Sequence, residues 1–442
     1  MIDRPIRLDQ RRRASVATTV AGHIVTQSGT TPVERFLLLI AVTTLPLEKH
    51  FPTVAGMSLS FLTFMMLAVY VIVNRPRALV EIWCHPVFIV AYAFVGVIVL
   101  LEFSSPPSRY EEAIRFAQMI VGGVCVAVFC RDRAGLAAGL YGHIAAALWV
   151  AVVLYLTSYG MLQEAGSTAS FQEATNLRSD VETGFKANKN SLAFVCIQGA
   201  VVAFALSLSG QFKYVRTLLL GVGIFCLVAA FLPMSRGAIV IGFVCAATIL
   251  HAHGVKQGKA LIFAAIVGIG IYLLVPDAVW SRMTFTTQVG ESGRMEARAH
   301  VYTTALNRLP EYILAGVGAG NFYNGWALEK GFVVGVKGGL VGAHNTLLQI
   351  TIFWGVLGLF MFLWLIWLVY RSIPLRCGRD ELSLALLGLM VSLGMLIFES
   401  HVFYDKHFAF GIGMVVGARQ WIWPRGAVSA VEVNQGPSPH GV

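Results

Sequence analysis

The chain has 442 residues, of which 57% are hydrophobic and 13% are charged, and its mean hydropathy is +0.71. Soluble domains carry about a quarter charged residues, so this composition excludes a soluble globular protein and predicts an all-α polytopic membrane protein. The formal net charge of +10 is the kind of bias that membrane topology produces, and it gives no sign of nucleic-acid binding.

The first 32 residues carry a cluster of arginines, Arg4, Arg7 and Arg11 to Arg13, followed by a stretch rich in Ser, Thr and Gly. A signal peptide would have a compact apolar core and a small-residue cleavage site after the basic residues. Residues 1–32 are therefore predicted to be a cytoplasmic tail.

Twelve apolar segments approach the length of about 20 residues that a helix needs to cross a bilayer. They are 33–47, 55–73, 86–103, 112–130, 135–159, 190–209, 214–234, 236–251, 259–275, 344–370, 382–399 and 402–421. The sequence thus predicts about twelve transmembrane helices, nine of them within 33–275 and three within 342–423.

Basic residues recur in every second connection, which fixes the orientation by the positive-inside rule. They are Arg75 and Arg77, Arg131 and Arg133, Lys213 and Arg216, Lys256 and Lys259, Arg371, Arg376 and Arg379, and Arg419 and Arg425. Both termini, including the polar tail 424–442, are predicted to be cytoplasmic. Two long connections, 160–189 and 276–341, then face outward.

Seven cysteines are present, none of them in a C-x-x-C pair or in an outward-facing loop. This pattern predicts neither a disulfide framework nor a zinc site.

An arginine stands at the outer boundary between two apolar segments, in Met234-Ser235-Arg236-Gly237. A charge placed at membrane depth is costly and is a functional hypothesis by default. The alternative is that Arg236 only reaches the lipid headgroups.

The large outer loop contains one segment with helical periodicity. Met295, Ala299, Tyr302, Leu306 and Leu309 recur at spacings of three and four and predict an apolar stripe. Ser292 is expected to cap this helix and Pro310 to end it. Arg294 and Arg298 share a face beside the stripe. They are interpreted either as binding residues or as snorkelling arginines of an interfacial helix.

Glycines crowd the segment from Gly316 to Phe322, GVGAGNF. A dinucleotide-binding loop is excluded because no strand precedes the segment and because it faces outward. We expect a tight turn that returns the chain to the bundle.

His344 and Asn345 open the tenth predicted span. A histidine titrates near neutrality and so suits a general base, and the start of a helix favours its neutral form. The alternative is a polar residue that merely lies at the interface.

Metal ligands are sparse. The outer loops hold no D-x-D pair, and the turn with His401, Asp405 and His407 lacks a convincing ligand spacing. No metal and no cofactor is expected.

The order of these segments resembles the bacterial O-antigen ligase family, whose superfamily also holds O-antigen polymerases and protein O-oligosaccharyltransferases. The resemblance covers about residues 185–348 and is carried by Phe185 with Asn188-Lys189-Asn190-Ser191-Leu192-Ala193, Ser235-Arg236-Gly237, Ser292-Gly293-Arg294, Leu314 to Phe322 and Ala343-His344-Asn345. Four positions after the loop arginine the family often has an aromatic residue, where this chain has Arg298.

The resemblance implies a membrane-embedded glycosyltransferase of the GT-C type that inverts the anomeric centre without metal. Its donor is a glycan on undecaprenyl pyrophosphate and its acceptor is an outer-core sugar of lipid A-core. Its place is the inner membrane of a Gram-negative bacterium, among membrane lipids, with the active site facing the periplasm and 276–341 as a large periplasmic loop.

His344 is then expected to be the general base, with Arg236 and Arg294 on the pyrophosphate and Arg298 as a further partner. Arginine binds phosphate oxygens bidentately without changing protonation. Asn190, Ser235 and Asn345 are expected to support these groups.

Two alternatives stay open. An O-antigen polymerase would use the same donor with a second lipid-linked glycan as acceptor. A transporter or flippase would need ionisable residues at the bilayer midplane and broken helices, for which Arg115 and His143 are the candidates.

Overall fold

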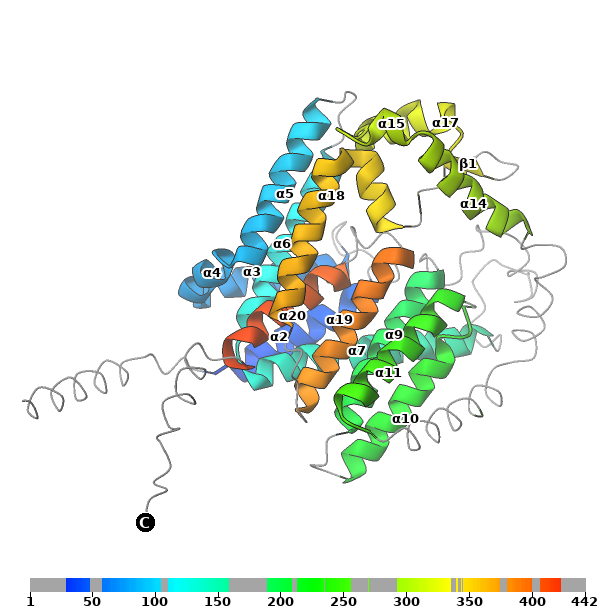
Figure 1. The fold of residues 1–442 in the computed structure, drawn as a ribbon. Coiled ribbons are helices and arrows are strands. Elements are labelled where there is room, and N and C mark those ends of the chain that lie inside the picture. The colour runs from blue at the N-terminus through cyan, green and yellow to red at the C-terminus, as the bar shows by residue number, and fades with distance from the viewer. Residues whose placement is uncertain are drawn as a thin grey trace, which may run out of the picture.

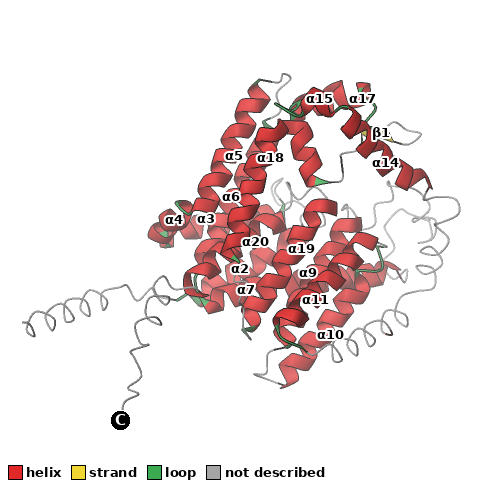
Figure 2. Ribbon diagram, viewed as in Figure 1, coloured by secondary structure: helices red, strands yellow, loops and turns green. Residues whose placement is uncertain are grey.

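The computed structural model describes residues 29–47, 58–104, 110–158, 189–208, 213–233, 235–255, 269, 292–334, 339–340, 343, 345–373, 380–399 and 406–422. Within this part of the chain the fold is helical apart from one short antiparallel pair, β1 (Val333–Val334) and β2 (Gly339–Leu340), with Val333 opposite Leu340. Figures 1 and 2 show the helices as one bundle with a smaller group of elements at one end.

The first half of the bundle consists of α2 (Pro32–Thr44), η1 (Leu45–Leu47), α3 (Leu59–Asn74), α4 (Pro76–Trp83), α5 (Pro86–Phe103), α6 (Glu111–Phe129) and α7 (Arg133–Ser158). The second half consists of α9 (Lys189–Ser207), α10 (Lys213–Ala229), α11 (Arg236–Ala252), α18 (Thr346–Ser372), α19 (Glu381–Glu399) and α20 (Lys406–Ile422).

The smaller group lies between α11 and α18 in the sequence, and we call it the roof. It comprises the helices α14 (Ser292–Asn307), α15 (Leu309–Tyr312) and α16 (Ala319–Asn321), the π-helical turn η2 (Phe322–Trp326), α17 (Ala327–Glu329) and the β1–β2 pair. Figure 1 places the roof at the end of the bundle where α5 ends.

Helices begin where polar side chains can satisfy the free amides of the first turn. Thr31 and Glu34 form a reciprocal capping box at the start of α2. Ser58, Ser235 and Asn345 cap α3, α11 and α18 by accepting from the third amide of each helix.

Each predicted span coincides with a helix except 259–275, of which only residue 269 is described. Five of these helices are long and apolar enough to cross a membrane, and a sixth is added if α3 and α4, bent by 106°, count as one. The helices α9, α10 and α11 contain shorter apolar stretches. The chain is a multi-pass membrane protein, but the count of twelve spans is not confirmed.

Two local differences from the prediction have clear causes. The helix α10 ends at Ala229, five residues before the predicted 234, because a turn over 230–233 precedes α11. The helix α4 was not predicted, since eight residues are too few to register as a span. It begins at Pro76 at the bend after α3.

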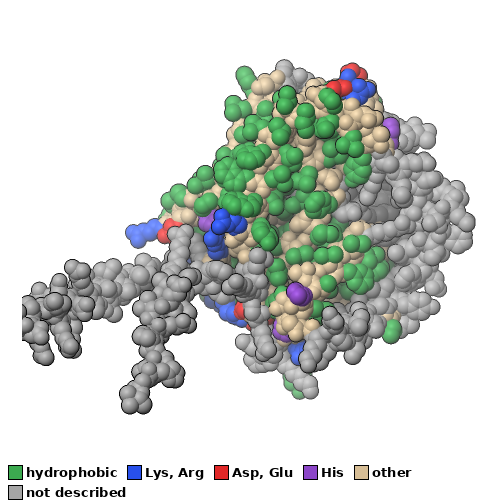
Figure 3. Space-filling view, in the orientation of Figure 1, with side chains coloured by type: hydrophobic (Ala, Val, Ile, Leu, Met, Phe, Trp, Pro, Cys, Tyr) green, Lys and Arg blue, Asp and Glu red, His purple; other side chains and the backbone are tan. Residues whose placement is uncertain are grey.

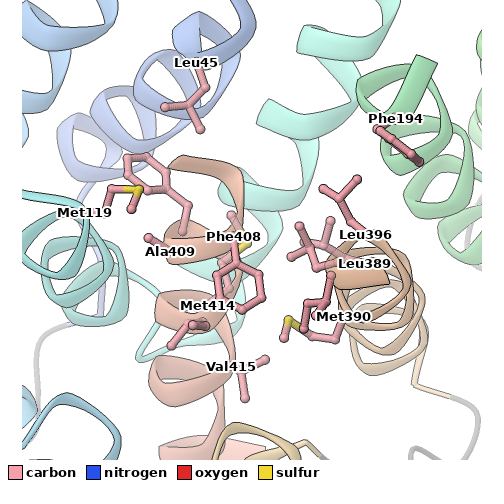
Figure 4. Packing of buried hydrophobic residues seen from close by; sticks show 14 of the residues in the cluster. Leu45, Met119, Phe194, Leu389, Met390, Leu396, Phe408, Ala409, Met414 and Val415 are labelled. Carbon is pink, nitrogen blue, oxygen red and sulfur yellow. The ribbon is translucent and has the colours of Figure 1, made fainter. Parts of the chain in front are cut away.

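Close helix packing depends on glycines at a few contacts. A Cβ atom at Gly413 would lie 2.2 Å from the carbonyl oxygen of Gly123, and one at Gly417 would lie 2.4 Å from that of Ala127. The helix α20 therefore packs directly against the backbone of α6, as small residues permit in membranes. Figure 4 shows Met119 of α6 and Met390 of α19 beside α20.

Three of the predicted cytoplasmic connections meet at one end of the bundle. Arg75 bonds to Glu34 at 2.6 Å, Arg131 to Glu81 at 2.7 Å, and Arg133 to Asp380 at 2.5 Å. This common end is what the orientation derived from the basic residues requires.

Asp132 ties the same end together by accepting from the Thr30 hydroxyl at 2.8 Å and the Gly135 amide at 2.7 Å. Burial alone would raise the pKa of Asp132, but the hydrogen bonds from Thr30 and Gly135 outweigh it and hold the pKa below its usual value.

Apolar side chains cover one face of the molecule between its two ends (Figure 3). Figure 3 shows apolar side chains over the face formed by α5 and α18, with charged side chains on the roof above them. The exposed residues of α18 include Leu357, Phe360, Trp364 and Trp367. Apolar side chains exposed over the length of a helix suit contact with lipid.

Candidate functional site

The helices α9 and α11 run parallel and begin at about the same height. A Cβ atom at Gly242 of α11 would lie 2.9 Å from Ile197 of α9. Asn190 is seven residues before Ile197 and Arg236 is six before Gly242, so both positions lie about 10 Å along the helix axes from this contact. The structure brings the backbones of Asn190 and Arg236 to one end of the bundle.

The helix α19 packs against both of them. A Cβ atom at its Gly388 would lie 2.5 Å from Val201 of α9 and 2.7 Å from Ile249 of α11. It begins next to Arg133 at the basic end, so it ends at the opposite one. Figure 1 shows the starts of α9 and α11 and the end of α19 turned toward the roof.

Ser235 and Arg236 form the start of α11. Ser235 is buried, and its hydroxyl caps the helix by accepting from the Ala238 amide at 3.4 Å. Arg236 is the first helical residue. The side chains of Asn190 and Arg236 lie outside the described residues.

The helix α18 is broken near its start. Trp354 (φ −131°) and Gly355 (φ +61°) are not helical, and they divide α18 into an arm, residues 346–353, and a long apolar segment, residues 356–372. In Figure 1 the arm runs from the break back toward α19. The arm carries the start of α18, and with it the predicted Asn345, away from the roof.

Asn345 caps the arm by accepting from the Leu348 amide at 3.1 Å. One turn further on, Gln349 reaches back and accepts from the Ala343 amide at 2.8 Å. Both Ala343 and Gln349 are buried. These two bonds fix the backbone on either side of His344, which itself lies outside the described residues.

Gln349 has a second polar atom with no assigned task. Its Nε2 is buried and has no hydrogen-bond partner among the described residues. An amide donor buried in this way is costly unless something accepts from it. Sequence reasoning missed Gln349, although its position four residues after Asn345 is the available signal.

The buried face of the helix α14 differs from the predicted apolar stripe. Among the side chains that are described, those of residues 300–307, Val301 and Ala305 are buried, whereas Leu306 is 64% exposed. By helical spacing, positions 294 and 298 fall on the face of Val301 and Ala305, not beside it. Arg294 and Arg298 thus stand on the face that the roof covers further along α14, although their side chains are outside the described residues.

The ends of α14 also differ from the prediction. The helix starts at Ser292 as its first residue and ends at Asn307, and Pro310 lies in the first turn of the next helix, α15. Proline is well tolerated there because its missing amide would have no helical partner.

The roof has its own aromatic core. The ring of Phe322 lies 5.6 Å from Phe332 and 5.3 Å from Phe353 of the α18 arm. Tyr312 donates its hydroxyl to the Ala305 carbonyl at 2.7 Å, and burial raises the pKa of Tyr312 to about 12. Tyr312 is thus a structural donor and no acid–base group near neutral pH.

The glycine-rich segment is a docking loop, in agreement with the predicted tight turn. The amides of Val317 and Gly318 donate to the carbonyls of Ile352 and Phe353, both at 2.9 Å. These are carbonyls that the break in α18 frees from their helical partners. The loop therefore completes the hydrogen bonding of the broken helix.

His407 is not part of an exposed turn. It lies buried in the first turn of α20, with its ring 5.9 Å from that of His143 in α7. His401 and Asp405, which the sequence placed with it as a possible metal site, lie outside the described residues. Within the described ranges no group of three or more His, Cys, Asp or Glu side chains is placed to hold a metal ion.

A comparison with known protein families matches residues 221–363 to a family described as O-antigen ligase. The matched range starts in α10 and ends in α18, so it includes Arg236, Arg294, Arg298, Asn345 and the whole roof. Asn190 lies before it. No curated protein matches the chain.

Proposed function

We propose, from the match of residues 221–363 to the family described as O-antigen ligase, that this chain is a member of that family and an inverting, metal-independent glycosyltransferase of the GT-C type. It transfers O-antigen polysaccharide from undecaprenyl pyrophosphate to the outer-core sugar of lipid A-core. The reaction takes place on the periplasmic side of the inner membrane of a Gram-negative bacterium. The match to this family supports lipid-linked polysaccharide substrates.

The observation that carries the proposal is the common height of the starts of α9 and α11. It puts Asn190 and Arg236 at the end of the bundle that faces the roof, and the roof contributes Arg294 and Arg298 from α14. Positions far apart in the sequence therefore stand around one end of the membrane bundle, where a lipid-borne pyrophosphate and a sugar hydroxyl can meet.

Each proposed role follows from the chemistry of the transfer. His344 removes the proton from the acceptor hydroxyl as its oxygen forms the new bond to the anomeric carbon. The bond from that carbon to the phosphate oxygen breaks, and its electron pair leaves with the pyrophosphate. Arg236 and Arg294, with Arg298, stabilise the charge that develops there. Pyrophosphate is a good leaving group, so no general acid is needed.

The supporting residues hold these groups in place. Ser235 caps the helix that Arg236 begins, and Asn345 caps the arm that follows His344. Asn190 is proposed to orient the donor from the start of α9.

A transporter is less well supported, because the broken helix α18, which this chain would share with transporters, has another explanation. Transporters use breaks in helices to expose backbone groups to their cargo. In α18 the freed carbonyls of Ile352 and Phe353 are already taken by Val317 and Gly318 of the roof.

Deletion of the gene tests the proposal and separates a ligase from a polymerase. Lipopolysaccharide is resolved on a gel while the lipid-carrier fraction is probed for glycan. Loss of all O-antigen from lipid A-core, with long polymer on the carrier, is the expected result. Lipid A-core capped with a single repeat would instead mean a polymerase, and an unchanged pattern would remove both.

Point variants in the complemented strain then test the site. His344→Ala and Arg236→Ala are expected to reproduce the deletion pattern at normal protein level. Arg308→Ala is the matched control, since Arg308 is a half-exposed arginine of the roof whose bond goes to its neighbour Glu311 at 2.9 Å. It is expected to ligate normally.

A further inference from the structure

Glu102 is a carboxylate buried where a carboxylate is expensive. It lies one residue before the end of α5, at the roof end of the bundle, and its side chain is 0% exposed. A charged group removed from water at a membrane protein's interior is retained only when other groups satisfy it, and it marks a functional position by default. The groups that donate hydrogen bonds to Glu102 therefore indicate its role.

Its carboxylate joins three parts of the molecule that are far apart in sequence. Oε1 accepts from the Ala319 amide at 2.5 Å, and Oε2 accepts from the Gly320 amide at 3.2 Å. Oε1 also accepts from the indole Nε1 of Trp354 at 3.1 Å. Glu102 thus links the end of α5, the glycine-rich loop of the roof and the break in α18.

Two glycines and one backbone hydrogen bond fix the conformation of the break in α18. Gly355 has φ +61°, and a Cβ atom there would lie 2.4 Å from the Leu314 carbonyl oxygen. On the other side Gly316 has φ +74°, and a Cβ atom there would lie 2.2 Å from the Phe353 carbonyl oxygen. The amide of Val356 completes the joint by donating to the Ile313 carbonyl at 2.6 Å.

Because of the length of the arm, a small rotation at the break displaces the start of the arm. Eight residues separate the break from Asn345, which is about 12 Å of helix. A rotation of about 5° at the break would therefore move the start of the arm by about 1 Å. A displacement of that size at a reacting group can cost about a hundredfold in rate.

We propose that Glu102 is a positioning residue for the transfer reaction: by locking the α18 break against the roof, it sets where the start of the arm, and the adjacent His344, stand relative to Arg236. This inference rests on the proposed function, because it assigns Glu102 to the base named there. Glu102 touches neither substrate nor reacting atoms and acts through the arm.

The test measures kcat and the donor KM of purified, reconstituted enzyme for Glu102→Ala and Glu102→Gln, normalised to folded protein. Glu102→Ala is expected to lower kcat by about a hundredfold, with the donor KM changed by less than about threefold. Glu102→Gln keeps one acceptor oxygen and the side-chain shape, so its kcat is expected to lie between those of the wild type and Glu102→Ala.

Two further variants separate positioning from folding. Trp354→Phe keeps the ring in the joint and removes the indole donor, so it is expected to lower kcat in the same direction, with a smaller effect in the Glu102→Gln background. Glu329→Gln is the control, because Glu329 is a 71% exposed carboxylate of the roof paired with Lys330. It is expected to leave kcat unchanged.

The outcomes distinguish the two proposals. A merely structural Glu102 would reduce the amount of folded enzyme and leave its kcat intact, which would overturn the inference. If Glu102→Ala does not accumulate, Glu102→Gln and Trp354→Phe decide in the same way. His344→Ala is run alongside: full activity in that variant would overturn the proposed base, whereas an inactive His344→Ala with a fully active Glu102→Ala would overturn only the role of Glu102.

Discussion

Gly355→Ala probes the joint in α18 with a single methyl group. Gly355 has φ +61° and ψ −161°, a conformation nearly exclusive to glycine, and an alanine there costs about 1–3 kcal/mol. Its Cβ would also stand 2.4 Å from the Leu314 carbonyl oxygen, and forcing extra atoms into a packed site costs about 1–3 kcal/mol. We expect a loss of about 2–6 kcal/mol in the free energy of unfolding, together with loss of transfer activity in the protein that still folds.

The matched control is Gly394→Ala in α19. A Cβ atom there would meet nothing within 4 Å, and alanine is the better helix former by up to about 1 kcal/mol. Unfolding titrations in mixed micelles measure both variants, and transfer assays follow on the folded fractions. If Gly355→Ala proves as stable and as active as Gly394→Ala, the rigid joint described above does not exist.

Three further predictions concern other contacts. Gln349→Met leaves the buried Ala343 amide without its acceptor, so activity is expected to fall and stability to drop by about 1–3 kcal/mol; Gln349→Glu, which keeps an acceptor, is expected to be less affected in the same unfolding and transfer assays. The pKa of Asp132 is lowered in the folded protein, so its stabilising contribution is complete above the unfolded pKa, near 4, and is lost as the pH falls through the folded value. Thermal unfolding between about pH 3 and 7 should show this acid loss, and Asp132→Asn should flatten it; an unchanged profile in the variant would contradict the assignment. Arg133→Ala removes the ion pairs of a half-exposed arginine with Asp380 and Glu381 and is expected to cost less than about 1 kcal/mol per pair with normal transfer. A larger loss in the unfolding titration would show that the pairs are stronger than their exposure implies.

The positions of the helices were largely predictable because hydrophobic length is a strong signal. The predicted span 86–103 and the helix α5 have the same bounds, since His85 and Pro86 mark the start and the apolar run ends at Phe103. The motif residues Ser235 and Asn345 were also placed correctly at helix starts, where their side chains cap.

The break in α18 was not predictable in the same way. The apolar run continues through Trp354 and Gly355, and hydropathy carries no information about backbone dihedral angles. A single glycine in such a run is common, and what makes Gly355 special is the approach of Leu314, a contact that exists only in the folded chain.

The stripe on α14 was misplaced for a related reason. Periodicity identified where apolar residues recur, but which face is covered depends on the roof elements that pack there. Val301 and Ala305 are buried by these neighbours, while Leu306 remains exposed. Glu102 was missed because a lone acidic residue at the end of an apolar run looks like an ordinary boundary residue until Ala319 and Trp354 are seen against it.

We propose that this chain transfers a glycan from a lipid pyrophosphate with His344 as base. The most direct test is transfer of labelled polysaccharide from undecaprenyl pyrophosphate to lipid A-core in vesicles that contain the purified protein, with His344→Ala and the control Arg308→Ala in parallel. We expect labelled lipopolysaccharide with the wild type and with Arg308→Ala, in the presence of a metal chelator, and none with His344→Ala. Transfer by His344→Ala at the wild-type rate, or no transfer by the wild type, would contradict it.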